Sequence, residues 1–336
     1  MKKINKFLVI MALVIIGVSV YADEIRLTIL HTNDIHGQLV PFDYTFNNPS
    51  NPPKQMKVEP NNIGGAARRA TYINNVRKFT DHTVLLLDAG DTFTRGPLES
   101  LEGEPEFEIM NALKYDVLTL GNNEFKADQY TGNFTPKAVD ILNERIKEAD
   151  FPVIAGNVYD KITGKRVYTP YIFKNIEGMR LAIIGVTAYR VKDYPQAANL
   201  NITDPVAEIG KILDEIKGKY DFVILLSHAG VIDDFSIAGK YQDLDLIIGG
   251  DSHTWIYKPV LTWNNKSGML STQAGELGVA VGRIDLVIEK QSDNRYIISK
   301  YAGELVPITD KYPEDGNIKN IVDKYYKIKN DASNEK

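Results

Sequence analysis

Short apolar runs alternate with longer amphipathic segments along most of the chain, which is the hydrophobic pattern of alternating strands and helices. Apolar, β-branched runs predict buried strands over residues 25–30, 83–87, 117–120, 151–155, 222–226 and 244–248. Amphipathic spacing predicts helices over residues 64–79, 105–113, 136–149 and 205–217. Because strands separated by helices usually pair in parallel, this pattern predicts an α/β fold.

The pattern changes toward the C-terminus, where strands follow one another with only turns between them. Strands are predicted over residues 260–263, 269–272, 279–288 and 296–301, and an earlier hairpin over residues 171–176 and 179–186. We therefore expect two stacked sheets flanked by helices. Residues 41–62, rich in Asn and Pro, predict a long loop, and residues 313–330 predict a final helix before a polar end.

The N-terminus has the composition of a secretory signal. Lys2, Lys3 and Lys6 precede an apolar run over residues 7–20, and Ala22 completes a small-residue cleavage pattern. We expect cleavage after Ala22 and a secreted or periplasmic protein, with an uncleaved anchor as the alternative. The run is shorter than the ~20 residues of a membrane span, so no transmembrane segment is expected after cleavage.

Composition excludes several kinds of chemistry. The 336 residues include no cysteine, which excludes disulfides, a thiol nucleophile and thiolate metal ligands. The formal net charge is −5, and it becomes −8 without the three lysines of the predicted leader. Because the chain has no basic run, a nucleic acid polymer is not an expected partner.

Polar side chains that can bind metal follow five of the predicted strands. They are Asp34 with His36, Asp91, Asn122, His228, and Asp251 with His253. The carboxyl ends of parallel strands meet at one edge of a sheet, where ligand sites collect, so we expect these side chains to lie close together. Oxygen and imidazole ligands without thiolate suit Mn, Zn, Mg or Fe.

Six stretches contain these strand ends or the start of a helix. They are Leu30-His31-Thr32-Asn33-Asp34-Ile35-His36-Gly37, Gly64-Gly65-Ala66-Ala67-Arg68-Arg69-Ala70, Asp88-Ala89-Gly90-Asp91, Gly121-Asn122-Asn123-Glu124-Phe125, Leu225-Leu226-Ser227-His228 and Ile247-Ile248-Gly249-Gly250-Asp251-Ser252-His253-Thr254, supported by Gln273-Ala274-Gly275. On these stretches the chain resembles the N-terminal domain of the 5′-nucleotidase branch of the calcineurin-like metallophosphoesterases. The resemblance implies a four-layer α/β/β/α sandwich over residues 23–305, between a signal peptide (1–22) and a linker-like helix and tail (306–336).

The resemblance also implies a centre of two divalent metal ions. One ion would be held by Asp34, His36, Asp91 and His253, and the other by Asp91 as bridge, Asn122, His228 and residue 251. In the family, metal-bound hydroxide attacks the phosphate esters of nucleotides, which implies a small phosphorylated substrate such as a nucleotide. Asn122 and Asn123 would contact the phosphoryl group, and His31, Asp88 and Lys126 would support the ligands from behind.

Three positions depart from the family pattern. Asn123 and Lys126 stand where the family has a catalytic His–Asp pair, and Asp251 stands where it has a His. Asn123 cannot exchange a proton near neutral pH, so it is either a hydrogen-bond donor to phosphate or a relic. Lys126 either brings positive charge to the phosphate or faces solvent. Asp251 either binds the second ion, which would favour Mn²⁺ or Mg²⁺ over Zn²⁺, or hydrogen-bonds the Thr254 backbone beside a vacated site.

Two functions follow from these residues. The leading hypothesis is an exported hydrolase of nucleotide catabolism, a phosphoesterase that favours substrates with good leaving groups because it lacks the general acid. The alternative is a catalytically impaired family member that binds metal or nucleotide. Sulfate or thiosulfate esters are further conceivable substrates. Residues 306–336 resemble the helix that leads to a base-binding domain in the family, so no nucleoside specificity is implied.

Overall fold

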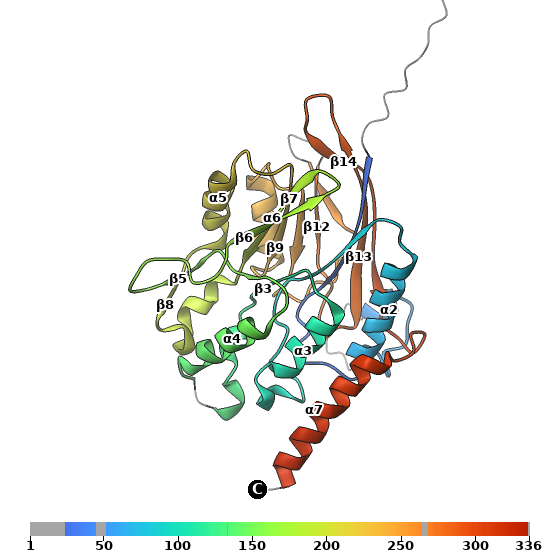
Figure 1. Cartoon of the computed structure of the whole chain (residues 1–336), viewed down its shortest axis with the longest axis vertical. Helices are drawn as coiled ribbons and strands as arrows, with labels where there is room; N and C mark the ends of the chain where they lie inside the picture. The colour runs from blue at the N-terminus through green and yellow to red at the C-terminus, as the bar shows by residue number, and fades with distance from the viewer. Residues whose placement is uncertain (1–23, 45–51, 133, 264–267, 335–336) are drawn as a thin grey trace, which may run out of the picture.

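Two six-stranded sheets form the body of the chain (Figure 1). The computed structural model describes residues 24–44, 52–132, 134–263 and 268–334. The first sheet has the order β14 (Tyr296–Pro307), β13 (Ala280–Lys290), β1 (Glu24–Thr32), β2 (Thr83–Asp88), β3 (Val117–Thr119), β4 (Val153–Ile154). The second has the order β11 (Val260–Thr262), β12 (Met269–Thr272), β10 (Leu246–Gly249), β9 (Phe222–Ser227), β7 (Met179–Val186), β6 (Tyr171–Ile176).

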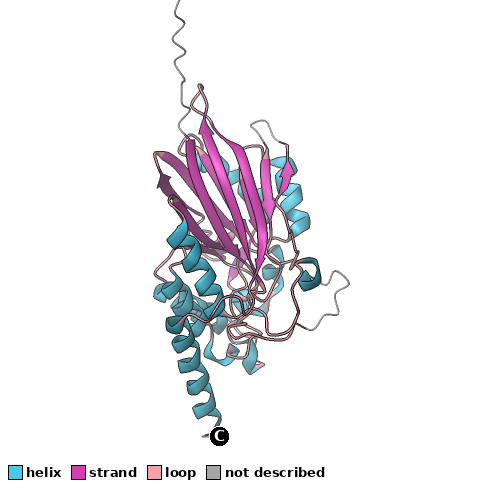
Figure 2. Ribbon diagram, turned by 90° about the vertical axis from the view of Figure 1, so that its right-hand side faces the viewer, coloured by secondary structure: helices cyan, strands magenta, loops and turns pink. Residues whose placement is uncertain are grey.

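Helices cover the outer face of each sheet. Beside the first sheet lie α2 (Ala66–Phe79), α3 (Glu104–Leu113), α4 (Lys137–Glu148) and α7 (Gly316–Asn334), and beside the second lie α5 (Pro205–Ile216) and α6 (Val231–Lys240) (Figures 1 and 2). The shorter elements are α1 (Pro52–Gln55), η1 (Glu99–Leu101), η2 (Glu124–Lys126), η3 (Gln129–Thr131), η4 (Tyr189–Asp193), η5 (Pro195–Ala197), and the pair β5 (Val158–Asp160) and β8 (Leu200–Ile202).

Alternation along the strands divides the apolar side chains between two faces. In β1, Leu27 and Ile29 pack between the sheets with Ile224 and Ile248 of the second sheet, whereas Leu30 belongs to the cluster beneath the helices. Successive side chains of a strand point to opposite faces, so a strand that is apolar throughout is buried on both. The four layers are therefore helices, sheet, sheet and helices, and the predicted α/β/β/α sandwich is confirmed.

Most of the predicted strands and helices are confirmed, with corrections at their ends. Strand β14 continues to Pro307, past the expected end at residue 301, because it stays paired with β13. Helix α7 continues to Asn334, into the segment expected to be a polar end. Helix α1 interrupts the predicted loop, and α6 was not predicted. The predicted signal peptide, residues 1–22, lies outside the described residues. No helix within the described ranges is both long and apolar enough to span a bilayer.

The strand register places the polar strand ends at one edge. Parallel pairing aligns Thr32 of β1 with Asp88 of β2, and Asp88 with Leu118 of β3. In the second sheet, Ser227 of β9 aligns with Val186 of β7 and Gly249 of β10. The loops that follow these strands therefore leave both sheets at their carboxyl ends, where a crevice forms in α/β folds.

The buried carboxyl of Glu106 on α3 makes stability depend on pH. Burial raises the pKa of Glu106 from 4.5 to about 8, and its Oε2 has no partner among the described residues. The folded chain thus retains a proton that the unfolded chain releases above pH 4.5, so stability falls as pH rises toward 8 and is then level. We predict that Glu106→Gln, which cannot ionise, gains stability over wild type progressively from pH 5 to pH 8.

Chemical denaturation of both proteins across this pH range measures the difference in unfolding free energy. Glu144→Gln on α4 is the matched control, because the Glu144 side chain is 65% exposed, and its difference from wild type should not change with pH. A constant difference for Glu106→Gln would show that Glu106 is ionised in the fold.

Candidate metal centre

Backbone hydrogen bonds join the loops that follow β1 and β2. The N–H groups of Asp34, His36 and Gly37 donate to the carbonyls of Gly90, Asp91 and Thr92 at 2.8, 2.9 and 2.9 Å. Three consecutive contacts of this kind fix the two loops relative to each other. The predicted ligands of the two loops, Asp34, His36 and Asp91, are therefore held in one rigid unit.

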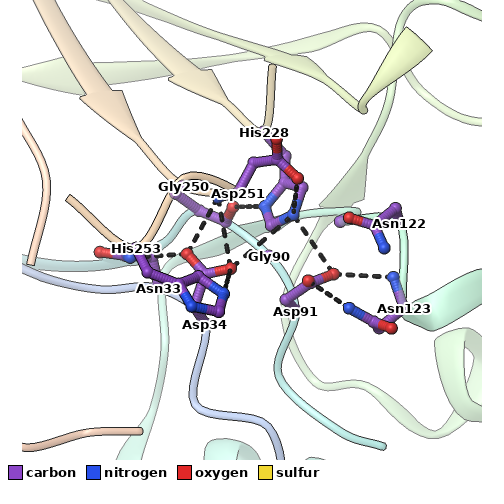
Figure 3. A network of polar contacts seen from close by, with 12 residues as sticks. Asn33, Asp34, Gly90, Asp91, Asn122, Asn123, His228, Gly250, Asp251 and His253 are labelled. Carbon is purple, nitrogen blue, oxygen red and sulfur yellow. Dashed lines mark hydrogen bonds and ion pairs between the residues drawn. The ribbon is translucent and has the colours of Figure 1, made fainter. Parts of the chain in front are cut away.

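Five of the seven predicted ligands have left-handed backbone conformations. The φ angles are 50° at Asp34, 50° at His36, 58° at Asp91, 75° at Asp251 and 52° at His253. For a residue other than glycine this conformation costs on the order of 1 kcal/mol, and it persists only where the surroundings enforce it. Such strain gathers at functional sites, and here it turns side chains from separate loops toward one point (Figure 3).

The first group of converging ligands is Asp34, His36 and His253. The Nε2 atoms of His36 and His253 lie 3.1 Å apart. Asp34 Oδ1 lies 3.8 Å from His36 Nε2 and 3.3 Å from His253 Nε2. Asp91 Oδ2 also approaches His36 Nε2, at 3.8 Å. Two imidazole nitrogens and carboxylate oxygens directed at one point suit a divalent ion such as Zn²⁺ or Mn²⁺. These residues fit the first predicted metal site.

The second group contains Asp34, Asp91 and His228, one ligand atom of each lying within 4.8 Å of the others. His228 Nε2 is 3.2 Å from Asp91 Oδ1 and 4.0 Å from Asp34 Oδ1. On the other side of its ring, His228 Nδ1 lies 2.6 Å from the carbonyl oxygen of Ala89. A ring nitrogen that donates to a carbonyl leaves the opposite nitrogen as the metal ligand, and in His228 that nitrogen faces the carboxylates.

The electrostatics of this cluster favour bound cations. Burial lowers the pKa of His228 and His253, but neighbouring carboxylates more than reverse this, raising the pKa of His253 to about 10 and that of His228 well above 6.5. For His253 the carboxylates are Asp34 and Glu276. An imidazole whose pKa is raised despite burial lies in a region of excess negative charge. A metal ion bound there would compensate the same excess.

Buried acids brace the ligand loops from behind. The Glu124 carboxylate accepts hydrogen bonds from the backbone N–H groups of Asp91, Thr92 and Gly121 at 3.0, 2.7 and 2.7 Å. Asp88 accepts from Thr32 Oγ1 at 2.5 Å and from Gly90 N at 2.8 Å, and burial raises its pKa to about 7. Glu124 thus connects the loop after β2 to the loop after β3.

The remaining residues predicted near the phosphate have contacts of their own. Asn123 donates from Nδ2 to Asp91 Oδ2 and from its backbone N–H to Asp91 Oδ1, the latter at 2.7 Å. Lys126 places Nζ 4.3 Å from the ring centroid of Tyr194. His31 is fully buried, which lowers its pKa to about 3, and its Nε2 lies 3.3 Å from Thr272 Oγ1, so it joins the first sheet to the second.

Arg190 of η4 contacts two predicted ligands of the second ion. Its guanidinium donates from Nη1 to Asp251 Oδ2 at 2.7 Å, from Nη2 to Asp251 Oδ1, and from Nη2 to Asn122 Oδ1 at 2.5 Å. The alternative in which Asp251 bonds the Thr254 backbone is wrong, because the Thr254 N–H donates to Gln273 Oε1. Asn122 and Asp251 lie beside His228 and Asp91 (Figure 3). The guanidinium of Arg190 contacts the oxygens that would bind a second ion.

Two residues of this centre were not predicted from the sequence. Glu276 Oε2 lies 2.6 Å from His253 Nδ1 and its Oε1 accepts from Tyr44. Its place directly after Gln273-Ala274-Gly275 was an available signal. Arg190 follows β7 in a segment without a motif, and only the tertiary structure brings it to Asp251.

An α/β/β/α sandwich with Asp, His and Asn gathered at its strand ends fits a metallophosphoesterase. The sequence model for calcineurin-like phosphoesterases matches residues 27–255, which include every predicted ligand. The chain belongs to this family, whose members use divalent metals, and it is a phosphoesterase relative of the 5′-nucleotidases. The resemblance drawn from the motifs is confirmed.

Several proteins similar to this chain are 5′-nucleotidases. The chain is 30% identical to the Vibrio cholerae 5′-nucleotidase over 77% of its own length and 48% of the relative. It is 28% identical to the Bos taurus 5′-nucleotidase over 89% of its own length and 52% of the relative. The crystal structure of the 5′-nucleotidase precursor from Thermus thermophilus superposes with a TM-score of 0.73 at 26% identity, over 90% of this chain and 58% of that one. The chain thus spans about half the length of these relatives.

The contact between Glu276 and His253 predicts an effect on metal affinity. A carboxylate that holds a histidine ligand fixes the orientation of its ring, and its loss typically lowers metal affinity about 10- to 100-fold. We predict a loss of this size in Mn²⁺ affinity for Glu276→Ala, measured by isothermal titration calorimetry. Glu276→Gln, which keeps an acceptor oxygen, should lose less. Equal affinities for wild type and Glu276→Ala would contradict the role of Glu276 in holding His253 as a ligand.

Proposed function

We propose that this protein is an exported, divalent-metal-dependent phosphoesterase that hydrolyses phosphate esters of nucleotides or similar small molecules. The observation that carries the proposal is the convergence of Asp34, His36, His253 and Asp91 on one point, at distances of 3.1 to 3.8 Å. This donor set suits a catalytic metal, and it belongs to a chain of the calcineurin-like phosphoesterase family.

Asp34, His36, Asp91 and His253 would hold the metal. When bound, a divalent ion polarises phosphoryl oxygens and lowers the pKa of water for attack on phosphorus. Glu124 keeps the Asp91 loop in place through three backbone hydrogen bonds. We propose Asn122 and Asn123, both buried next to Asp91, as the amides that contact the phosphoryl group when substrate binds.

Export is supported by the sequence. Residues 1–22 have the basic start, apolar centre and small-residue end of a signal peptide. The related Thermus thermophilus protein is described as a 5′-nucleotidase precursor. We propose that the mature chain begins at Asp23, with the phosphoesterase domain over residues 23–305 and a linker-like helix and tail over residues 306–336.

The proton donor for the leaving group would be water. Asn123 has no titratable group, and its amide donates to Asp91. Lys126, the other position where the resemblance expected a member of the catalytic pair, stacks on Tyr194. A missing general acid typically lowers the rate 10²–10⁴-fold for a poor leaving group. If turnover of every ester is lost in this way, the chain acts as a metal- or nucleotide-binding protein.

Because no side chain would protonate the leaving group, the rate of hydrolysis should depend strongly on which leaving group the ester carries. We expect the Mn²⁺-loaded protein to hydrolyse p-nitrophenyl phosphate about 10²-fold or more faster than adenosine monophosphate, because nitrophenolate leaves without a proton. Initial rates of phosphate or nitrophenol release across Mn²⁺, Zn²⁺ and Mg²⁺ measure this ratio, with Asp91→Asn as the blank. Comparable rates on the two esters would contradict the assignment of the proton to water. Rates equal to the blank on both would contradict the enzyme and favour the binding protein.

A further inference from the structure

The guanidinium of Arg190 joins two predicted ligands of the second ion, Asp251 and Asn122. It contacts both carboxylate oxygens of Asp251 in a fork and the amide oxygen of Asn122 with the same Nη2. Bidentate guanidinium–carboxylate pairs are among the stronger polar contacts in proteins. Asp251 is held from the other side as well, because its backbone N–H donates to Asp34 Oδ2 at 2.9 Å.

A guanidinium and a metal ion compete for these oxygens. An arginine side chain has donors only, so it cannot itself bind a metal. Asn122 has one side-chain oxygen, and that atom accepts from Arg190. An ion held by Asn122 and Asp251 would also lie next to the positive charge of Arg190, and like charges at such short range repel each other. With Arg190 in place, Asp91 and His228 alone remain of the four predicted ligands.

One ion and the guanidinium together match the charge of the three aspartates among the predicted ligands. Asp34, Asp91 and Asp251 carry three negative charges, and one divalent ion with one guanidinium supplies three positive charges. The guanidinium lies close to the centre, since Asp251 Oδ1, to which it is bound, is 3.7 Å from His228 Nε2. Its side chain is 49% exposed while that of Asp251 is 10% exposed, so the arginine also faces the solvent from which an anionic ester arrives.

We propose that this centre holds a single divalent ion, at Asp34, His36, Asp91 and His253, and that Arg190 supplies the second positive charge in place of a second ion. The inference rests on the proposed metal-dependent function and specifies it. In this arrangement, Arg190 attracts the phosphoryl group by charge and hydrogen bonding and provides no Lewis acid.

Metal stoichiometry tests this inference. Metal-free full-length protein is titrated with Mn²⁺ by calorimetry, and the bound metal is counted by elemental analysis after desalting. We expect one equivalent for wild type and two for Arg190→Ala, which frees Asn122 and Asp251. The electron paramagnetic resonance spectrum should show an isolated Mn²⁺ ion in wild type and an exchange-coupled pair in the variant.

Arg180→Ala is the matched control. Arg180 forms a similar paired contact with Asp221, and its side chain is 50% exposed on the surface of β7, so its removal should leave one equivalent bound. Two equivalents in wild type, or one in a folded Arg190→Ala, would overturn the inference and leave the metal-dependent function standing. Folded wild type that binds no Mn²⁺, Zn²⁺ or Mg²⁺ would overturn both. The wild-type count decides the question even if Arg190→Ala fails to fold.

Discussion

The concentration of buried negative charge at the carboxyl ends of the strands is the constraint on which this structure depends. Asp34 and Asp91 are almost fully buried, and Asp251 lies beside them. Isolated charges are costly to bury, so carboxylates this close together require cations nearby. The protein provides two kinds, protonatable imidazoles and a guanidinium. The metal expected from the family is a third kind of cation that meets the same requirement.

The fold holds this charge in place through strained and braced loops. Left-handed backbone at Asp34, His36 and Asp91 aims their side chains inward, at a conformational cost that the surrounding hydrogen bonds offset. Glu124 fixes the Asp91 loop, and Glu276 fixes His253. The sandwich contributes rigidity, because the strands that carry these loops are buried on both faces. The ligand side chains therefore have little freedom to move apart when no metal is bound.

The sequence was sufficient for the features that depend on local pattern. Buried strands such as β9 and β10 were visible as apolar runs, and the strand-end ligands followed from them. Helix α6 was missed because its sequence, with Asp233 and Asp234 in the first turn, follows directly on the His228 loop without a clear boundary. The contact of Arg190 with Asp251 joins residues 61 positions apart. No spacing rule signals such a pair, so the sequence alone did not place an arginine beside the predicted ligands of the second ion.

The number and place of the cations at this centre can be seen in a crystal structure of Mn²⁺-soaked protein, with anomalous diffraction recorded near the manganese absorption edge. We expect one anomalous peak, bounded by Asp34, His36, Asp91 and His253, with the Arg190 guanidinium still on Asp251 and Asn122. A second peak between Asn122, His228 and Asp251, with Arg190 displaced, would contradict this expectation.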